Sequence, residues 1–337
     1  MKWFSVNIVL LVMMIFILAC GTSVEISENQ SANKKNEHKL SETVNEIMPS
    51  ILKIDVLGFY KTWYFGENDN ILKDDIDYSK IDSISVFSDI RSESMSGTAI
   101  VLYVDEDFCG LLTCAHVVSF PDTIYTYFDL NETLVKSVSI MQEQNIYESG
   151  RPLRDEYGII VTDEKMDLAF LKKSLLGEGE TPKVFPLEAG DVNKLNWGSE
   201  IFVLGYPLGK LMLTDGIVSL DKSKNIRFIS NALFNKGISG SPVFGLQEGS
   251  DDFLWLGMAS SAASQSLEYF EPLNNDFDIT RADFQFYNYA VARNKQFINY
   301  GVTYSISIEE ILTFVSRNKN TLEVAGFETD LIISNKN

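Results

Sequence analysis

The sequence predicts an all-β fold that ends in one clear α-helix. From Ile51 onward, roughly a dozen short segments rich in β-branched and aromatic residues follow one another, separated by turn residues. Apolar residues at helical spacing stand out in only one late segment, and the sequence has no repeat of fixed period. Many short strands with few helices are typical of a β-sandwich or of paired β-barrels.

The strands are expected where short apolar or alternating runs lie between turn residues. In chain order, the expected strands are Ile51–Leu57, Ser83–Phe87, Thr98–Val104, Phe108–Thr113, Tyr125–Phe128, Ile159–Val161, Leu168–Lys172, Glu200–Gly205, Met212–Ser219, Ile226–Ile229, Pro242–Gly245, Leu254–Ala259 and Gly301–Ile306.

The helix is expected over residues 307–317. Ser307 and Glu310 form a capping-box pattern, and the apolar residues that follow recur on one face. These apolar residues are Ile308, Ile311, Leu312 and Val315. Residues 319–337 are polar and are expected to be a loose tail, with Phe327 and the Leu331–Ile333 patch as the parts that could dock back.

The first nineteen residues have the features of a secretory signal peptide. Lys2 gives a basic start, and the apolar run from Val6 to Leu18, about 13 residues, is shorter than the roughly 20 that a bilayer span needs. Ile17-Leu18-Ala19-Cys20 resembles the bacterial lipobox, which implies cleavage before Cys20 and lipidation of its thiol. The alternatives are an ordinary signal peptide and an anchoring helix with an incidental cysteine.

The lipoprotein interpretation predicts a location at the bacterial cell envelope, with the chain held on a membrane by its lipid and facing outside the cytoplasm. Residues 20–45 are rich in Ser, Asn, Glu and Lys, and are expected to be a flexible tether. Residues 41–47 also have the spacing of a weak helix, so that alternative stays open.

Composition excludes several classes of protein. The 337 residues carry 28 Lys and Arg against 47 Asp and Glu, a net charge of −19, so the chain lacks the basic surface that nucleic-acid binding needs. Three cysteines are too few for a disulfide scaffold, and Cys109 and Cys114 are expected to be buried thiols. His116 is the only histidine beyond the tether, which is too few for a usual zinc site, so no metal or other cofactor is expected.

Three motifs carry the residue types of a nucleophilic site, in the order His, Asp, Ser. His116 follows the end of an expected strand at Thr113, Asp167 immediately precedes Leu168-Ala169-Phe170-Leu171, and Ser239 lies in Gly237-Ile238-Ser239-Gly240-Ser241-Pro242. A serine hydroxyl is a weak nucleophile unless a neighbouring base removes its proton during the attack. An imidazole held by a carboxylate is such a base.

These motifs resemble those of trypsin-like serine proteases, and the segments 203–209 and 216–219 resemble the second barrel of high-temperature-requirement proteases. The resemblance covers about residues 46–318 and implies a chymotrypsin-like double β-barrel with a C-terminal helix. Barrel 1 is expected at about 46–175 and barrel 2 at about 183–306. An appended peptide-binding (PDZ) domain is not expected, because it needs roughly 80–100 residues and only about 20 follow the helix.

The resemblance also implies roles for single residues. Ser239 would attack a peptide carbonyl, His116 would take the proton and return it to the leaving amine, and Asp167 would fix the tautomer of His116. The N–H groups of Gly237 and Ser239 would form the oxyanion hole. The expected function is a serine endopeptidase that cleaves protein or peptide substrates through an acyl-enzyme. Two alternatives stay open, which are a catalytically silent binding module with this fold and a serine esterase or acyl transferase.

Substrate preference is predicted from residues 231–236, which are expected to line the primary specificity pocket. Leu233 stands six residues before Ser239, where trypsin-like enzymes that select basic side chains carry Asp, and Phe234 follows it. A preference for uncharged, apolar side chains is therefore expected. The aromatic segment 264–300 is longer than a hairpin needs, and is either a recognition or gating insert or a set of rings packed over the barrel.

Overall fold

The structure is a computed structural model that describes residues 37–129, 131–150, 156–175, 181–219, 227–272 and 290–334. The chain divides into two compact units, residues 1–48 and residues 49–337. In the first unit a helix covers residues 37–47, which differs from the flexible tether predicted through residue 45 and agrees with the helical alternative. The predicted signal peptide and Cys20 lie outside the described residues. Among the helices that are described, none is both long and apolar enough to cross a bilayer.

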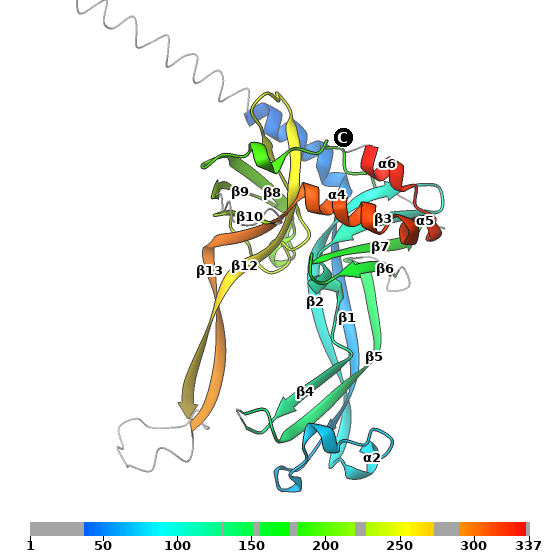
Figure 1. Cartoon of the computed structure of the whole chain (residues 1–337), viewed down its shortest axis with the longest axis vertical. Helices are drawn as coiled ribbons and strands as arrows, with labels where there is room; N and C mark the ends of the chain where they lie inside the picture. Colours follow the sequence, from blue (N-terminus) through cyan, green and yellow to red (C-terminus); the bar gives the residue numbers. More distant parts are fainter. Residues whose placement is uncertain are drawn as a thin grey trace, which may run out of the picture. The chain divides into compact units, whose positions relative to one another are not determined.

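The first half of the second unit is a seven-stranded antiparallel sheet (Figure 1). Its order is β4-β5-β1-β2-β3-β7-β6. The strands are β1 (Ile51–Tyr64), β2 (Phe87–Val104), β3 (Phe108–Thr113), β4 (Thr123–Tyr127), β5 (Val135–Glu148), β6 (Gly158–Asp163) and β7 (Leu168–Ser174). The N–H of Tyr157, just before β6, donates to the carbonyl of Ile146 in β5 over 2.7 Å. The sheet therefore comes back on itself as barrel 1, with β4 added on the outside of β5.

The second half of this unit is a closed barrel, barrel 2, with the order β10-β13-β12-β11-β8-β9. Its strands are β8 (Glu200–Gly205), β9 (Met212–Ser219), β10 (Arg227–Ser230), β11 (Pro242–Leu246), β12 (Phe253–Pro272) and β13 (Ala290–Ser307). Side chains from all sides of the barrel fill its interior, among them Ile201, Val203, Phe228, Ile238 and Leu256. The predicted double β-barrel is confirmed.

Several strands were predicted with the bounds that the structure has, and others were not. The predicted bounds of β3, β8 and β9 agree with the structure. The strand predicted over Ser83–Phe87 is wrong, because this stretch holds the end of the short helix α2 (Ile81–Ile84) and only the first residue of β2. Strand β5 was not predicted.

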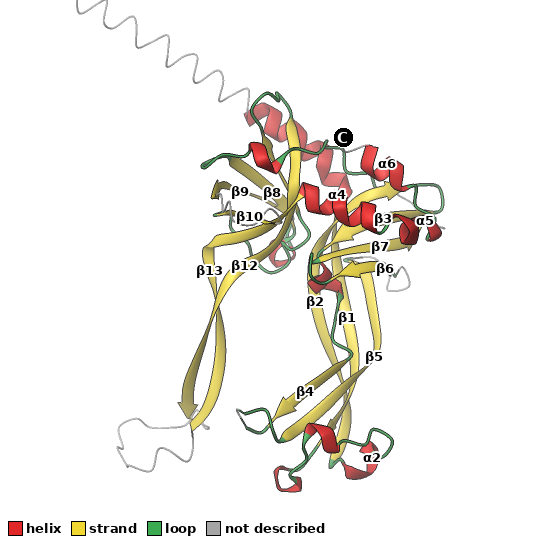
Figure 2. Ribbon diagram, in the orientation of Figure 1, coloured by secondary structure: helices red, strands yellow, loops and turns green. Residues whose placement is uncertain are grey.

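Strands β1 and β2 are longer than predicted, because they continue as a paired ribbon past the barrel (Figure 2). They stay in register without a break from Ile51 opposite Ile100 to Tyr64 opposite Phe87. A second small core closes the far end of the ribbon. We call it the distal cluster, and it consists of Trp63, Phe65, Ile76, Ile81, Val135 and Val138. It gives this extension apolar packing of its own, away from the two barrels.

Short helices connect the strands, and three helices follow the last one. Besides α2, the single-turn helices are η1 (Met48–Ser50), η2 (Glu67–Asp69), η3 (Lys73–Asp75), η4 (Val192–Lys194), η5 (Pro207–Gly209) and α3 (Ala115–Val118). The predicted C-terminal helix is α4 (Ile308–Arg317), where the Ser307 side chain accepts a hydrogen bond from the N–H of Glu310. The helices α5 (Lys319–Val324) and α6 (Thr329–Ser334) follow.

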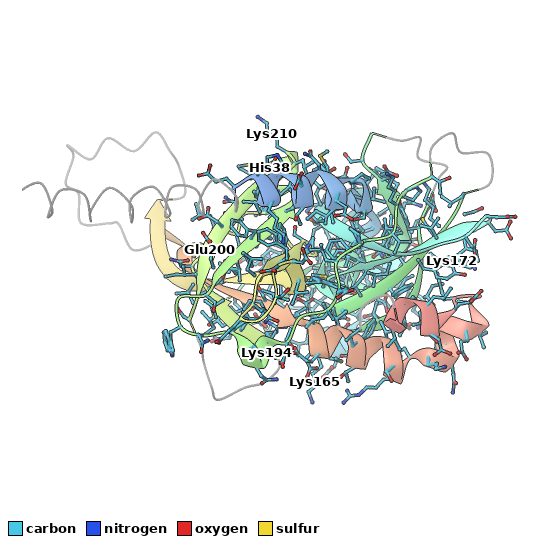
Figure 3. The ribbon with its side chains drawn as sticks, turned by 90° about the horizontal axis from the view of Figure 1, so that it is seen from above. His38, Lys165, Lys172, Lys194, Glu200 and Lys210 are labelled. Atoms are coloured by element: carbon cyan, nitrogen blue, oxygen red, sulfur yellow. The ribbon has the colours of Figure 1, made fainter. Side chains whose placement is uncertain are left out.

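The tail predicted to be loose after residue 318 forms the helices α5 and α6, and Phe327, predicted as a part that could dock back, does so on barrel 1. Leu322 and Ile332 are also buried, whereas Val324 and Leu331 are exposed. Phe327 is 2 % exposed, and its ring makes edge-to-face contacts with Tyr103, Phe108 and Phe170 at 5.0 to 5.4 Å between centroids. Lys172, labelled beside these helices in Figure 3, donates to the carbonyl of Ala325 and lies 3.6 Å from the centre of the Phe108 ring. Phe327 is thus part of the packing of barrel 1.

Candidate active site

His116 and Asp167 are joined by a direct hydrogen bond. The Nδ1 atom of His116 lies 2.8 Å from Oδ1 and 3.0 Å from Oδ2 of Asp167. A carboxylate can only accept, so Nδ1 carries the proton and Nε2 is left free to act as a base. The backbone N–H of His116 also donates to Oδ1, over 3.1 Å. One carboxylate therefore holds both the ring and the main chain of the histidine.

Local structure explains how each of these two residues is presented. The helix α3 buries Ala115, Val117 and Val118, so His116 is the one side chain of this turn that faces outward. Asp167 lies in the turn between β6 and β7 with a φ of +62°, a left-handed conformation that Asp tolerates better than most residues. The Asp163 side chain closes this turn by accepting from the N–H of Met166 over 2.9 Å.

Ser260 on β12 is a site residue that the sequence did not indicate. Its hydroxyl, which is buried, donates to Oδ2 of Asp167 over 2.6 Å. Burial alone would raise the pKa of Asp167, but the hydrogen bonds and the charge attraction from His116, together with the Ser260 hydroxyl, outweigh it and lower that pKa. Asp167 is therefore ionised at neutral pH. Ser260 lies in a run of small residues, Ala259-Ser260-Ser261-Ala262-Ala263, that carries no recognisable motif.

The loop that carries Ser239 is fixed by hydrogen bonds to both barrels. Thr98 of β2 donates its side chain to the carbonyl of Gly237 over 2.8 Å and its N–H to the carbonyl of Ser239 over 2.9 Å. The N–H of Gly240 donates to Ala259 of β12 over 2.8 Å. Gly237 has a φ of +97°, and a Cβ there would lie 2.4 Å from the carbonyl oxygen of Tyr206, so only glycine fits.

This loop leaves two backbone donors unused. Among the described residues, no hydrogen-bond acceptor faces the N–H of Gly237 or the N–H of Ser239. Both belong to the turn that holds the serine, so they can serve an oxygen that develops negative charge beside it. These are the two groups that the sequence predicts for an oxyanion hole.

The Ser239 hydroxyl donates to the carbonyl of Ser260 over 2.9 Å and not to His116. Ser260 thus touches both the acid, through its hydroxyl, and the serine, through its carbonyl. The three predicted residues are brought to one place by this chain of contacts. Among the described residues, no hydrogen bond joins Ser239 to His116.

The two residues predicted for the specificity pocket point in different directions. Leu233 is 55 % exposed, whereas Phe234 is 2 % exposed and packs in the core of barrel 2 with Ile238. Neighbouring residues in an extended segment point to opposite sides, which explains the difference. Leu233 alone of the two is open to a ligand. Of the predicted aromatic insert, residues 264–272 and 290–298 pair in the long β12–β13 ladder. Residues 273–289, and the side chains of residues 264–300, lie outside the described part of the chain.

Cys114 lies beside the pair, so that its sulfur and the ligand atoms of His116 and Asp167 are within 4.8 Å of one another. These residue types can bind zinc, but only as a thiolate, a free imidazole nitrogen and a free carboxylate. Burial, followed by the nearby charge of Asp167, raises the pKa of the Cys114 thiol well above its usual value. The thiol stays neutral and the other two groups bond to each other, so the cluster does not fit a metal.

One family model matches a part of the chain, residues 97–250. This segment matches the family model of the trypsin-like peptidase domain. It contains all three predicted motifs and extends from Gly97 in β2 to Ser250 after β11. A search with the whole sequence finds no curated protein that matches it.

Solved structures with a similar arrangement of the chain include Rv3671c from M. tuberculosis H37Rv, in a mutant inactive form and in its active form. The inactive form has 15 % sequence identity and a TM-score of 0.43, and the match covers 83 % of this chain and 91 % of that one. The active form has 16 % identity and a TM-score of 0.41, with 84 % of each chain covered. The HtrA-type protease AlgW with a tripeptide has 13 % identity and a TM-score of 0.40, over 82 % of this chain and 62 % of that one.

Proposed function

For a chain that carries a trypsin-like peptidase domain, we propose the function of a serine endopeptidase that cleaves protein or peptide substrates. The observation that carries the proposal is the hydrogen bond from Nδ1 of His116 to a buried, ionised Asp167. It gives His116 the tautomer whose Nε2 can accept a proton. The family model supports the peptidase class, and the residue roles are part of the proposal.

In this mechanism the Ser239 hydroxyl turns from the Ser260 carbonyl toward His116. Its oxygen attacks the carbonyl carbon of the scissile bond while its proton passes to Nε2 of His116. The carbonyl oxygen becomes an oxyanion that accepts from the N–H groups of Gly237 and Ser239. The C–N bond then breaks, the amine leaves with the proton from His116, and water hydrolyses the acyl-enzyme by the same steps. Asp167 stabilises the imidazolium at each transfer.

The contact from Ser239 to Ser260, and not to His116, favours a second candidate, a catalytically silent module that binds peptides. A fluorophosphonate probe distinguishes the two. We expect the probe to label the protein, the Ser239→Ala variant to lose the label, and a Ser305→Ala control, another serine of barrel 2, to keep it. Label that persists in Ser239→Ala, or no label on the unchanged protein, would count against the enzyme. Turnover of small esters without peptide cleavage would indicate an esterase instead.

Location and preference complete the proposal. We propose that the chain is anchored by lipid on Cys20 at the bacterial cell envelope and acts outside the cytoplasm. Washed membranes should hold the protein, and the Cys20→Ala variant should move to the soluble fraction.

We also propose that the exposed Leu233 gives a preference for apolar side chains. Kinetics on matched Val and Arg peptides test this, and faster cleavage after Arg would contradict it.

A further inference from the structure

The N-terminal half of β2 is an edge strand with one side unpaired. From Phe87 to Ser96 every residue is exposed on both faces of the sheet. On one side β2 pairs with β1 from Phe87 to Ile100, whereas on the other side β3 joins only from Ile100 onward. Over residues 87–97 the described part of the chain therefore contains no second partner strand. Figure 1 shows this length of β2 below the end of β3.

The direction of the unpaired groups follows from Thr98. Its N–H bonds to Ser239 and its carbonyl accepts from the Thr113 hydroxyl, so both of its backbone groups point away from β1. In an antiparallel ladder this direction alternates from residue to residue. The N–H and C=O groups of the even-numbered residues therefore point to the open side. These residues are Ser88, Ile90, Ser92, Ser94 and Ser96, and no backbone partner is found for them there among the described residues.

The open edge has few of the usual means of protection. Natural edge strands discourage pairing with proline, with charged side chains, above all lysine, or with a bulge. Residues 87–97 contain neither proline nor lysine, and their pairing with β1 shows no register shift. Their charged residues, Asp89, Arg91 and Glu93, have odd numbers, so their backbone groups point toward β1 and their side chains lie on the face of the sheet opposite to the serines. Four of the five residues with outward groups are serines, whose small side chains leave room for another strand. From residue 88 to residue 98 the edge is about 34 Å long.

The edge ends at the proposed active site. Its last outward N–H, that of Thr98, donates to the carbonyl of Ser239, and a Cβ on Gly97 would lie 2.6 Å from Val117 of α3. The helix α3 carries His116, which must protonate the leaving amine. The amine therefore leaves on the side of Ser239 that faces α3 and β2. The substrate chain that follows the scissile bond starts where this edge ends.

We propose that this downstream part of the substrate binds as an added strand along residues 88–96 of β2. Its occupant is an extended polypeptide with free backbone amides, recognised by main-chain hydrogen bonds and not by particular side chains. This inference rests on the proposed function. It makes the enzyme selective for substrates that are unfolded or extended over about ten residues after the cut.

Substrate length is the first test. Two quenched fluorescent peptides share the residues before the cut and have about two or about ten residues after it, a length set by the 34 Å edge. We expect a higher kcat/KM for the long peptide. In the variant Ser94→Pro, which lacks one outward N–H but keeps every bond to β1, kcat/KM for the long peptide should fall about fivefold, the worth of one hydrogen bond. The short peptide should be cleaved as before. The matched control Ser94→Ala keeps the N–H and should match the unchanged protein.

A second test does not depend on how the variant folds. Two versions of the long peptide are N-methylated after the cut, one at the odd-numbered and one at the even-numbered amides. Methylation should lower kcat/KM in the version whose methylated amides face β2 and leave kcat/KM of the other version unchanged. Equal kcat/KM for the two peptide lengths, or equal effects of the two methylation patterns, would overturn the strand addition without contradicting the proposed peptidase function. A dimer that Ser94→Pro converts to a monomer, with no length effect, would also overturn it, in favour of pairing between copies.

If no peptide is cleaved, the proposed function fails, and binding still decides the inference. Anisotropy of the labelled long peptide on Ser239→Ala should then show the same loss with the added Ser94→Pro change. Equal affinity with and without proline would overturn the strand addition.

Discussion

Removal of the Ser260 hydroxyl tests the charge balance at the proposed site. In the variant Ser260→Ala, Oδ2 of Asp167 loses its 2.6 Å hydrogen bond, while Asp167 itself is only 8 % exposed. A hydrogen bond to a charged group is worth about 1.5–3 kcal/mol. We expect the free energy of unfolding at neutral pH to fall by about that amount, and the pKa of Asp167 in the folded protein to rise.

The pH dependence gives this prediction its sign. The pKa of Asp167 in the folded protein lies below its usual value of 3.8. The stabilisation of the folded protein by the ionised Asp167 is therefore fully present above pH 3.8, and it is lost as the pH falls through the pKa of Asp167 in the folded protein. The difference between Ser260→Ala and the unchanged protein should therefore be largest near neutral pH. It should shrink once Asp167 is protonated in both proteins.

Urea unfolding at neutral and at acidic pH measures the two differences. Ser305→Ala is the matched control, because Ser305 is equally buried in barrel 2 and no described group bonds to its hydroxyl. The control should cost little and show no pH dependence. We also expect kcat to fall about tenfold, which corresponds to about 1.4 kcal/mol of lost transition-state stabilisation. The reasoning is refuted if Ser260→Ala costs the same at both pH values or no more than Ser305→Ala.

Three further predictions address other parts of the site and fold. Gly237→Ala places a Cβ 2.4 Å from the Tyr206 carbonyl oxygen, and it should lower kcat about 100- to 1000-fold because it moves an oxyanion donor. The control Gly198→Ala, at a position with a similar φ and no atom within 4 Å, should leave kcat unchanged in the same peptide assay. Cys114 should resist iodoacetamide at pH 8 until urea unfolds the chain, because its thiol is buried and the pKa of that thiol is raised. A label found on Cys114 by mass mapping after treatment of the folded protein would contradict this. Phe327→Ala should lower the free energy of unfolding by about 3–5 kcal/mol, because it removes a buried ring from an aromatic cluster. A loss below about 1 kcal/mol, measured by urea unfolding, would show that Phe327 is not docked on barrel 1.

The sequence predicted the double barrel because the strands that form it carry local signals. β3, β8 and β9 are short apolar or β-branched runs between turn residues, and their predicted bounds agree with the structure. Strand β5 has polar residues in its second half, and it is held by pairing with β1 on one side and β4 on the other. Such pairing between distant segments leaves no local pattern, which is why β5 was missed.

For the proposed site, too, the sequence indicated the residues that lie in local motifs and missed a residue that depends on the fold. His116, Asp167 and Ser239 each lie in a motif with a fixed neighbourhood, so all three could be proposed from the sequence alone. Ser260 could not, because its role depends on β12 passing both Asp167 and Ser239, and a serine among small residues carries no signal of that path. Phe234 was assigned to a pocket wall because spacing from Ser239 does not give the direction of a side chain, and it lies in the core.

The docking of Phe327 also has a consequence during protein synthesis. The other rings of its cluster, on β2, β3 and β7, have all been translated by Ser174, whereas Phe327 is translated 153 residues later. At about 5–20 residues per second, this interval is about 8–30 s. During that time the nascent chain exposes an apolar socket on its first barrel. A chaperone that covers this apolar surface would have to release it by the time Phe327 emerges from the ribosome.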